Sequence, residues 1–334
     1  MSDSFSRTGS HPRWPASDSP SSPGHEPPSR ETQPIAMPPP STPVSSPRVA
    51  AYAPEAPAGT PRSGGIVRSP RGFTYLLGAR IGDGSFGAVF DCIGPFDQDY
   101  ALKVFWAGTR PYAEVHEQWL REAERLYRLR HPNIVYVHDY FESGGLFHLV
   151  LERCDHSLED MLGTAFTDRL VVDLLRQLLF AIQYLSDHEI VHNDLHAGNV
   201  LVVQGDRLTV KLSDLGIAHD LYGMPAVRPA IVQHRIMAPE VAAGGYSTKQ
   251  SDLYQLGLLA YQMHTGDYPL DTSHGYDAIV EQIRAGVPRA KAEALGTPLG
   301  NIISVMLRRQ EHYRYTSAAQ VWDDLRALDV STSG

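Results

Sequence analysis

The spacing of apolar residues changes along the chain. Residues 1–71 contain almost no periodic run of Leu, Ile, Val or Phe, whereas apolar residues recur regularly from residue 72 onward. Short apolar runs at 75–77, at 88–90 and at 100–105, with a glycine-rich stretch between the first two, predict three strands, the first two joined by a tight turn.

Helical spacing follows these strands. Residues 114–130 repeat apolar side chains every three or four positions and end at His131-Pro132, which predicts an amphipathic helix. Two more strands are expected at 134–140 and 146–151, and residues 171–185 are apolar on most sides, as in a buried helix. The pattern therefore predicts an α+β protein with a small sheet-rich lobe before a larger helical lobe.

Composition places the domain boundary near residue 72. Residues 1–71 hold about two-thirds of the prolines and much of the serine, so they cannot bury enough apolar surface to offset the entropy of ordering. We expect a disordered tail at 1–71 and a folded domain at 72–330. Its first lobe would span 72–151, its hinge 152–155 and its second lobe 156–330.

The tail contains six Ser-Pro or Thr-Pro pairs and a run of three prolines. It is either a solvated spacer or a set of sites for a proline-directed kinase or a groove-binding partner of the SH3 or WW kind. The sequence does not separate these two interpretations. The pairs are Ser19-Pro20, Ser22-Pro23, Thr42-Pro43, Ser46-Pro47, Thr60-Pro61 and Ser69-Pro70.

Charge and cysteine content narrow the function classes. The formal net charge is −9, and the folded part has no cluster of Lys and Arg, which argues against nucleic acid as a partner. Cys92 and Cys154 lack metal-ligand spacing, as expected in a reducing compartment. No signal peptide and no run of 18 apolar residues is present, so we expect a cytoplasmic monomer without membrane contact.

The stretch from Ile81 to Val89 fits the pattern G-x-G-x-x-G-x-V through Gly82, Gly84 and Gly87. Glycines let backbone amides approach phosphate oxygens, although glycine-rich turns between strands are common. A dinucleotide-binding fold would continue with a helix. Because this chain continues as a strand, a loop covering nucleotide phosphates is the better interpretation.

A lysine and a glutamate could complete a phosphate site. Lys103 interrupts an apolar strand, where a lone lysine is often just an exposed residue. Glu122 lies in the next predicted helix, so a Lys–Glu pair directed at the α- and β-phosphates is plausible.

Two acidic residues and an asparagine lie in polar segments farther along the chain. Asp194 can accept the proton of a hydroxyl nucleophile, and Asn199, five residues later, offers an amide oxygen suited to Mg²⁺. Asp214 follows a predicted strand and can hold a metal that bridges phosphates. Each piece could be an ordinary loop, but their order and spacing together favour phosphoryl transfer.

In this order the motifs resemble a eukaryotic-type (Hanks-type) protein kinase domain from about Phe73 to Leu328. The resemblance continues through Met237-Ala238-Pro239-Glu240, through a helix beginning near Ser251-Asp252, and through Arg314, which in this family pairs with the glutamate of the A-P-E motif. It implies the bilobal protein kinase fold, with ATP and Mg²⁺ as cofactors.

The resemblance also assigns the nucleotide contacts. Leu151 would be the gatekeeper beside the adenine, and the backbone of the hinge at Glu152 and Cys154 would bind the edge of the base. The glycine loop from Ile81 would cover the phosphates. The residues expected to sandwich the adenine ring are Val89, Ala101 and Leu201.

Two departures concern regulation. Asn193 stands where the common H-R-D motif has arginine, which in this family pairs with a phosphorylated activation loop, so the chain resembles a non-RD variant. The loop from Ile217 to Ile236 contains no serine or threonine and one tyrosine, Tyr222. We hypothesise that activation-loop phosphorylation is not required.

Two further departures concern the substrate side. His196 replaces the usual lysine two residues after Asp194, and Gln233 replaces the threonine that contacts that lysine. A histidine carries part of a charge near neutral pH, so we expect weaker or pH-dependent stabilisation of the transition state.

Three functions therefore remain open. The favoured one is a serine/threonine protein kinase with Asp194 as base and with protein substrates that the sequence does not identify. The second is a pseudokinase scaffold that binds ATP without efficient transfer. The third is a small-molecule phosphotransferase, because Asp194 to Asn199 is similar to the D-L-H-x-x-N loop of aminoglycoside and choline kinases.

Overall fold

The structure is a computed structural model that describes residues 61–84, 87–108, 110–229 and 231–328. The predictions for the tail up to residue 60, including five of its six Ser-Pro and Thr-Pro pairs, lie outside the described residues.

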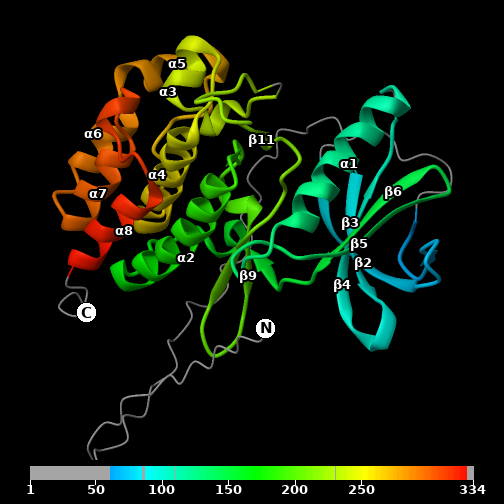
Figure 1. Ribbon diagram of the computed structural model, residues 1–334. Coiled ribbons are helices and arrows are strands. Elements are labelled where there is room, and N and C mark those ends of the chain that lie inside the picture. The colour runs from blue at the N-terminus through cyan, green and yellow to red at the C-terminus, as the bar shows by residue number, and fades with distance from the viewer. Residues whose placement is uncertain (1–60, 85–86, 109, 230, 329–334) are drawn as a thin grey trace, which may run out of the picture. The chain divides into compact units, whose positions relative to one another are not determined.

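A six-stranded antiparallel sheet with one long helix forms the first lobe (Figure 1). The strands follow the order β1-β2-β3-β4-β6-β5, and helix α1 (Tyr112–Arg128) packs against β5 and β6. The predicted strands and helix of this lobe are confirmed within a few residues. The strands are β1 (Ile66–Arg68), β2 (Thr74–Gly84), β3 (Gly87–Ile93), β4 (Asp99–Phe105), β5 (Val137–Ser143) and β6 (Leu146–Glu152).

The domain begins earlier than residue 72. Strand β1 pairs with Thr74–Leu76, and the side chain of Val67 is buried. The hydroxyl of Ser69 is also buried and donates a hydrogen bond to Oδ2 of Asp139 at 3.0 Å. The predicted boundary is therefore wrong for these residues, and Ser69-Pro70 is not part of an exposed tail. Strand β1 was not predicted because it is only three residues long and shows no clear apolar pattern.

Helices dominate the second lobe. Helices α2 (Asp168–Asp187) and α4 (Lys249–Thr265) form its centre, and α2 matches the predicted buried helix. Thr167 and Thr248 cap their N-termini through side-chain oxygens, and Gly266 ends α4 in the left-handed conformation. The remaining helices are α3 (Pro239–Gly244), α5 (Gly275–Ala285), α6 (Val287–Glu293), α7 (Pro298–Met306) and α8 (Ala318–Ala327).

Two small sheets position the polar segments of the second lobe. Strand β9 (Val200–Val203) pairs with β7 (His156–Ser157) and with β10 (Thr209–Leu212). Strand β8 (Ile190–Val191) pairs with β11 (His219–Asp220). The segments containing Asp194 and Asp214 are thus fixed at both ends by strands.

A buried ion pair ties α3 to the C-terminal part of the domain. Arg314 donates to both carboxylate oxygens of Glu240, and the two side chains are 0% and 3% exposed. Ser251 also donates to Glu240, and Arg314 donates to the backbone carbonyls of Arg308 and Gln250. The predicted pairing of the A-P-E glutamate with this arginine is confirmed.

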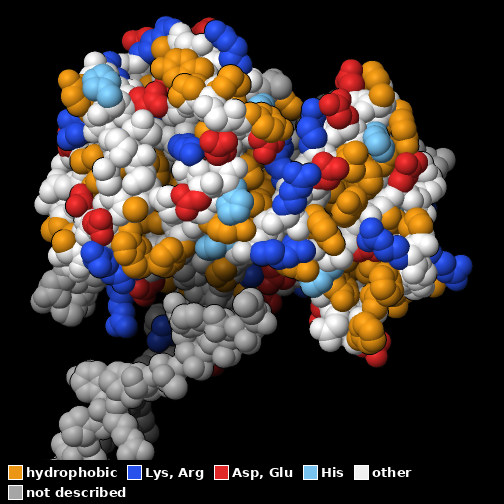
Figure 2. All heavy atoms as spheres, viewed as in Figure 1, with side chains coloured by type: hydrophobic (Ala, Val, Ile, Leu, Met, Phe, Trp, Pro, Cys, Tyr) orange, Lys and Arg blue, Asp and Glu red, His pale blue; other side chains and the backbone are white. Residues whose placement is uncertain are grey.

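Charges of both signs are interspersed over the face drawn in Figure 2 rather than gathered in separate areas. None of the helices in the described ranges combines the length and the apolar content needed to span a bilayer.

Acid should destabilise this domain partly through His148. Burial lowers the pKa of His148 to about 4, and its Nδ1 has no hydrogen-bond partner among the described residues. Between pH 6.5 and 4 the unfolded chain binds a proton there that the folded chain does not, so stability falls as the pH falls through this window.

We therefore expect His148→Phe to reduce the loss of stability between pH 7 and pH 5 by about 2 kcal/mol. Urea unfolding at both pH values measures this difference, with His274→Phe at an exposed histidine as control. An equal loss in the wild type and in His148→Phe would contradict the prediction.

Candidate active site

Lys103 joins the two lobes through carboxylates from distant parts of the chain. Its Nζ donates to Oε1 of Glu122 on α1 at 2.9 Å and to Oδ1 of Asp214 at 3.1 Å. The three side chains are 12%, 2% and 40% exposed, so Asp214 is the member that solvent reaches. The predicted Lys–Glu pair is present, and it meets the predicted metal ligand directly.

These contacts keep the lysine charged. Burial alone would lower the pKa of Lys103, but the charges of Asp214 and Glu122 raise it above its usual value. Burial raises the pKa of Glu122, and the charge of Lys103 works against that rise. Although removal from water would raise the pKa of Asp214, Lys103 and the N–H of Gly216 hold it below its usual value.

Lys103 shares one face of the sheet with three predicted nucleotide contacts. Lys103 is opposite Val89, Ala101 is opposite Leu151, and Ala101 lies two residues from Lys103 on the same strand. Because side chains two residues apart point to the same face, all four lie on it together. Val89 and Leu151 are half-buried, and Ala101 is buried.

The other predicted nucleotide contacts frame this face. Ile81 is exposed, Gly82 pairs with Val89, and Gly84 ends β2 next to the undescribed residues 85–86. Glu152 ends β6 and forms an ion pair with Lys211. Cys154 is buried two residues later, and Leu201 is half-buried on β9.

Gly87 has a structural role. A Cβ there would overlap the carbonyl oxygen of Val104 on the neighbouring strand. A Cβ on Gly82 would make only ordinary contact with Val89, at 3.5 Å. The need for glycine at position 87 therefore comes from strand packing, which the motif alone did not reveal.

Residues 192–199, called the catalytic loop below, are held by α4. The buried carboxylate of Asp252 accepts hydrogen bonds from the backbone N–H groups of His192 and Asn193 at 2.8 and 2.9 Å. Gln255 accepts from Leu195 N and donates to Asn193 O. The backbone position of Asp194 is thus fixed on both sides.

Asp194 has one satisfied and one unsatisfied carboxylate oxygen. Nδ2 of Asn199 donates to its Oδ2 at 2.9 Å and to its backbone oxygen at 3.0 Å, whereas Oδ1 is buried without a hydrogen-bond partner among the described residues. Burial and the charge of Asp214 raise the pKa of Asp194 to about 7. An oriented carboxylate with one oxygen free of hydrogen bonds can accept a proton from a hydroxyl that reaches it.

His196 lies close to this carboxylate but is uncharged. Its Nε2 is 3.7 Å from Oδ1 of Asp194, and its Nδ1 accepts from the N–H of Gly198. Burial and the charge of Arg235 lower the pKa of His196 to about 4. The expected partial charge near neutral pH is therefore wrong. Gln233 lies near enough to Asp194 to lower its pKa.

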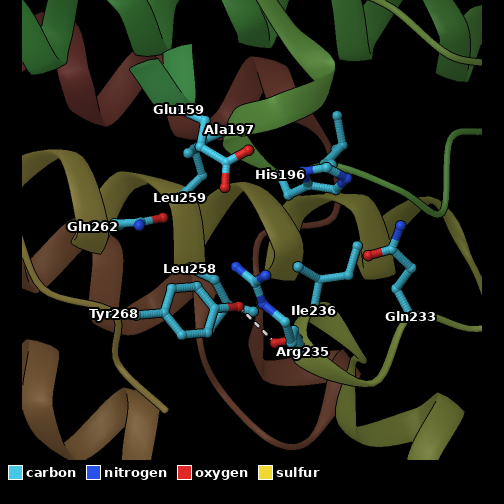
Figure 3. A pocket seen from close by; sticks show the side chains of 11 residues that line it. Glu159, His196, Ala197, Gln233, Arg235, Ile236, Leu258, Leu259, Gln262 and Tyr268 are labelled. Carbon is cyan, nitrogen blue, oxygen red and sulfur yellow. Dashed lines mark hydrogen bonds between the residues drawn. The ribbon is translucent and has the colours of Figure 1, made fainter. Parts of the chain in front are cut away.

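A pocket beside the catalytic loop contains residues that the sequence analysis did not single out. Figure 3 shows Glu159 above Ala197, with Arg235 and Tyr268 opposite, and the hydroxyl of Tyr268 donates to the backbone oxygen of Arg235 at 2.6 Å. No motif marks Glu159, Arg235 or Tyr268, because these residues come from three separate segments.

The donor set fits Mg²⁺. The amide nitrogen of Asn199 is engaged by Asp194, which directs the amide oxygen away from it, and Asp214 is partly exposed. No group of three or more His, Cys, Asp and Glu side chains suited to a metal was found in the described ranges. Mg²⁺ does not need such a group of side chains, because one or two protein oxygens together with substrate phosphates can hold it.

Gly216 belongs to the motif Asp214-Leu215-Gly216, but nothing in the sequence indicated how closely it packs against two carboxylates. A Cβ there would lie 3.0 Å from Oδ1 of Asp214 and 3.1 Å from Oε2 of Glu122, so both carboxylates would have to move. We expect Gly216→Ala to lower kcat/KM for ATP about tenfold, because a small displacement of positioned groups is costly. Gly205→Ala, whose Cβ would meet only Arg207 O at 3.8 Å, is the control, and steady-state kinetics at varied ATP is the measurement. Unchanged kinetics in Gly216→Ala would refute the constraint.

Comparisons with known proteins agree with this geometry. The sequence profile described as the protein kinase domain matches residues 75–324. The chain is 27% identical over 263 residues to serine/threonine-protein kinase PrkC of Bacillus subtilis, covering 75% of this chain and 40% of that protein. It is 31% identical over 258 residues to serine/threonine-protein kinase Pkn1 of Myxococcus xanthus, covering 74% and 37%.

Human serine/threonine-protein kinase STK11 is 28% identical over 260 residues, covering 72% of this chain and 58% of that protein. The chain thus spans about two-fifths of the length of the two bacterial relatives and somewhat more of the human one. The profile match covers most of the chain and includes every site residue described above, so the chain belongs to the protein kinase family.

Proposed function

We propose that this chain transfers the γ-phosphoryl group of ATP to serine or threonine hydroxyls of protein substrates. The observation that carries the proposal is the contact of Lys103 with both Glu122 and Asp214, beside a catalytic loop that presents the open oxygen of Asp194. The names of the relatives support the choice of serine and threonine as acceptors.

Each side chain has a role that its surroundings support. Lys103, held by Glu122, would bind the α- and β-phosphates of ATP, and the loop of Gly82 and Gly84 would cover them. The sheet face of Val89, Ala101 and Leu151 would contact the adenine, with Leu201 on its other side and the hinge backbone at Glu152 and Cys154 along its edge.

Asn199 and Asp214 would hold Mg²⁺, which when bound neutralises phosphate charge. The chain's own contribution is positioning and proton transfer. Asp194 orients the acceptor hydroxyl and takes its proton through Oδ1, while the bonds from Asn199 keep the carboxylate in place.

The neutral state of His196 favours one alternative, a pseudokinase scaffold. Burial and the charge of Arg235 lower the pKa of His196 to about 4, so His196 does not supply a positive charge beside Asp194 at pH 7. A small-molecule phosphotransferase is less well supported, because the Glu240–Arg314 pair and the helices after it resemble the protein kinase arrangement.

Three measurements on the full chain separate these functions. They are a thermal shift with ATP and Mg²⁺, transfer of labelled phosphate to a library of serine, threonine and tyrosine peptides, and transfer to aminoglycosides and choline. The proposal predicts a shift and transfer to serine or threonine peptides. A shift without transfer supports the scaffold, and transfer only to small alcohols supports the third function.

A further inference from the structure

Arg125 on α1 makes a bidentate contact with the segment that follows Asp214. Its Nε and Nη2 donate to Oδ2 of Asp220 at 3.0 and 2.8 Å, and its Nη1 lies 3.3 Å from the backbone oxygen of Leu215. The two charged side chains are 13% and 27% exposed, so water screens this ion pair only in part. One guanidinium therefore connects α1 to two points of residues 214–240, called the activation segment below.

The position of Arg125 makes this contact relevant to the active site. Arg125 follows Glu122 by three residues in α1, so the two side chains lie on the same face of the helix. Leu215 directly follows Asp214. Two contacts therefore join α1 to the same segment: one through Glu122, Lys103 and Asp214, and one directly from Arg125. A rotation of α1 that broke one contact would strain the other.

Asp220 is itself anchored to strand β8, which precedes the catalytic loop. It pairs with Ile190 in the β11–β8 ladder, and the N–H of the next residue, Leu221, donates to Glu189 O at 2.7 Å. Strand β8 leads directly into His192. Asp220 therefore connects α1, through Arg125, to the backbone that carries Asp194.

The sequence around Asp220 contains few side chains that could be phosphorylated and then bind Arg125 in place of Asp220. Residues 217–236 contain no serine or threonine, and Tyr222 is 82% exposed. Asn193, which precedes Asp194, receives a hydrogen bond from the hydroxyl of Ser247 and contacts Nδ1 of His219. The negative charge that binds Arg125 on α1 is thus the carboxylate of Asp220, which needs no phosphorylation to be present.

We propose that Asp220 is a positioning residue for phosphoryl transfer, which acts through Arg125 to hold α1 where Glu122 pairs with Lys103. The activation segment then keeps α1 in place without covalent modification. This inference rests on the proposed function for its kinetic test, and a structural test that does not need activity accompanies it.

The kinetic test compares full-length Asp220→Asn with the wild type. We expect kcat/KM to fall about 3- to 10-fold, while the melting temperature falls by less than about 4 °C, since the pair can shift the position of α1 by no more than its own contribution to stability. Asp220→Glu should retain part of the activity. The double variant Arg125→Glu with Asp220→Arg should have a higher kcat/KM than either of its two single variants. Glu117→Gln, which breaks an exposed ion pair on the same helix, is the matched control and should leave kcat/KM unchanged.

Hydrogen exchange is the structural test. Asp220→Asn should speed amide exchange in α1 and in residues 214–221 while leaving α2 unchanged. Phosphatase treatment of the wild type should alter neither its rate nor its exchange pattern. Wild-type kinetics and wild-type exchange in Asp220→Asn would overturn the inference, as would a wild-type rate abolished by phosphatase. If the wild type transfers no phosphate, the proposed function fails, and faster exchange in α1 still supports the positioning role.

Discussion

Replacing Asp194 with asparagine is expected to lower kcat by about 10²- to 10⁴-fold, the usual contribution of a general base. Asparagine has almost the same shape and can still accept the hydrogen bond from Asn199, so the loop should keep its conformation. The change removes only the capacity of this side chain to take a proton.

Binding and catalysis should therefore separate in this variant. We expect the thermal shift with ATP and Mg²⁺ to remain, because Lys103, Asn199 and Asp214 are untouched. Single-turnover transfer to the best library peptide, with the wild type alongside, is the measurement. Asp194→Asn with the rate of the wild type would mean that another group takes the proton, and the assignment of Asp194 as base would be abandoned.

Removing Arg314 should cause a large loss of stability in the domain. Its guanidinium is fully buried against Glu240, and Arg314→Ala leaves that carboxylate without its cation. Breaking a buried pair in this way typically costs about 3–5 kcal/mol, because the remaining charge is uncompensated. For a domain of this size we expect the melting temperature to fall by about 6–15 °C.

A matched variant and a double variant test the cause. Arg326→Ala breaks an exposed pair with Asp323 and should change stability by less than about 0.5 kcal/mol. Arg314→Met combined with Glu240→Leu removes both charges and should recover part of the loss. If Arg314→Ala is as stable as Arg326→Ala, the pair does not hold α3 in place.

Motif spacing predicted the centre of the site well. Lys103, Glu122 and Asp214 are separated by up to 111 residues, yet their meeting was expected because the types of residue and their order match one chemistry. The strands and helices around them were also predictable, since apolar runs and helical spacing mark most of them. Strand β1 was not, because only two of its three residues are apolar and serine, proline and glycine surround it.

Contacts outside motifs could not be predicted. The Arg125–Asp220 pair joins residues 95 positions apart that no pattern distinguishes from other surface charges. The neutral state of His196 depends on burial and on Arg235, which packing decides. The need for glycine at position 216 arises from two carboxylates in different lobes.

The Glu240–Arg314 pair also bears on how the chain is synthesised. Translation delivers Glu240 long before Arg314, so a ribosome-bound chain that ends before residue 314 carries a carboxylate whose partner does not yet exist. Such a nascent chain cannot complete the packing of α3, and the loop that precedes it has no fixed support. We therefore expect α3 to take its final position only after Arg314 has emerged from the ribosome and paired with Glu240.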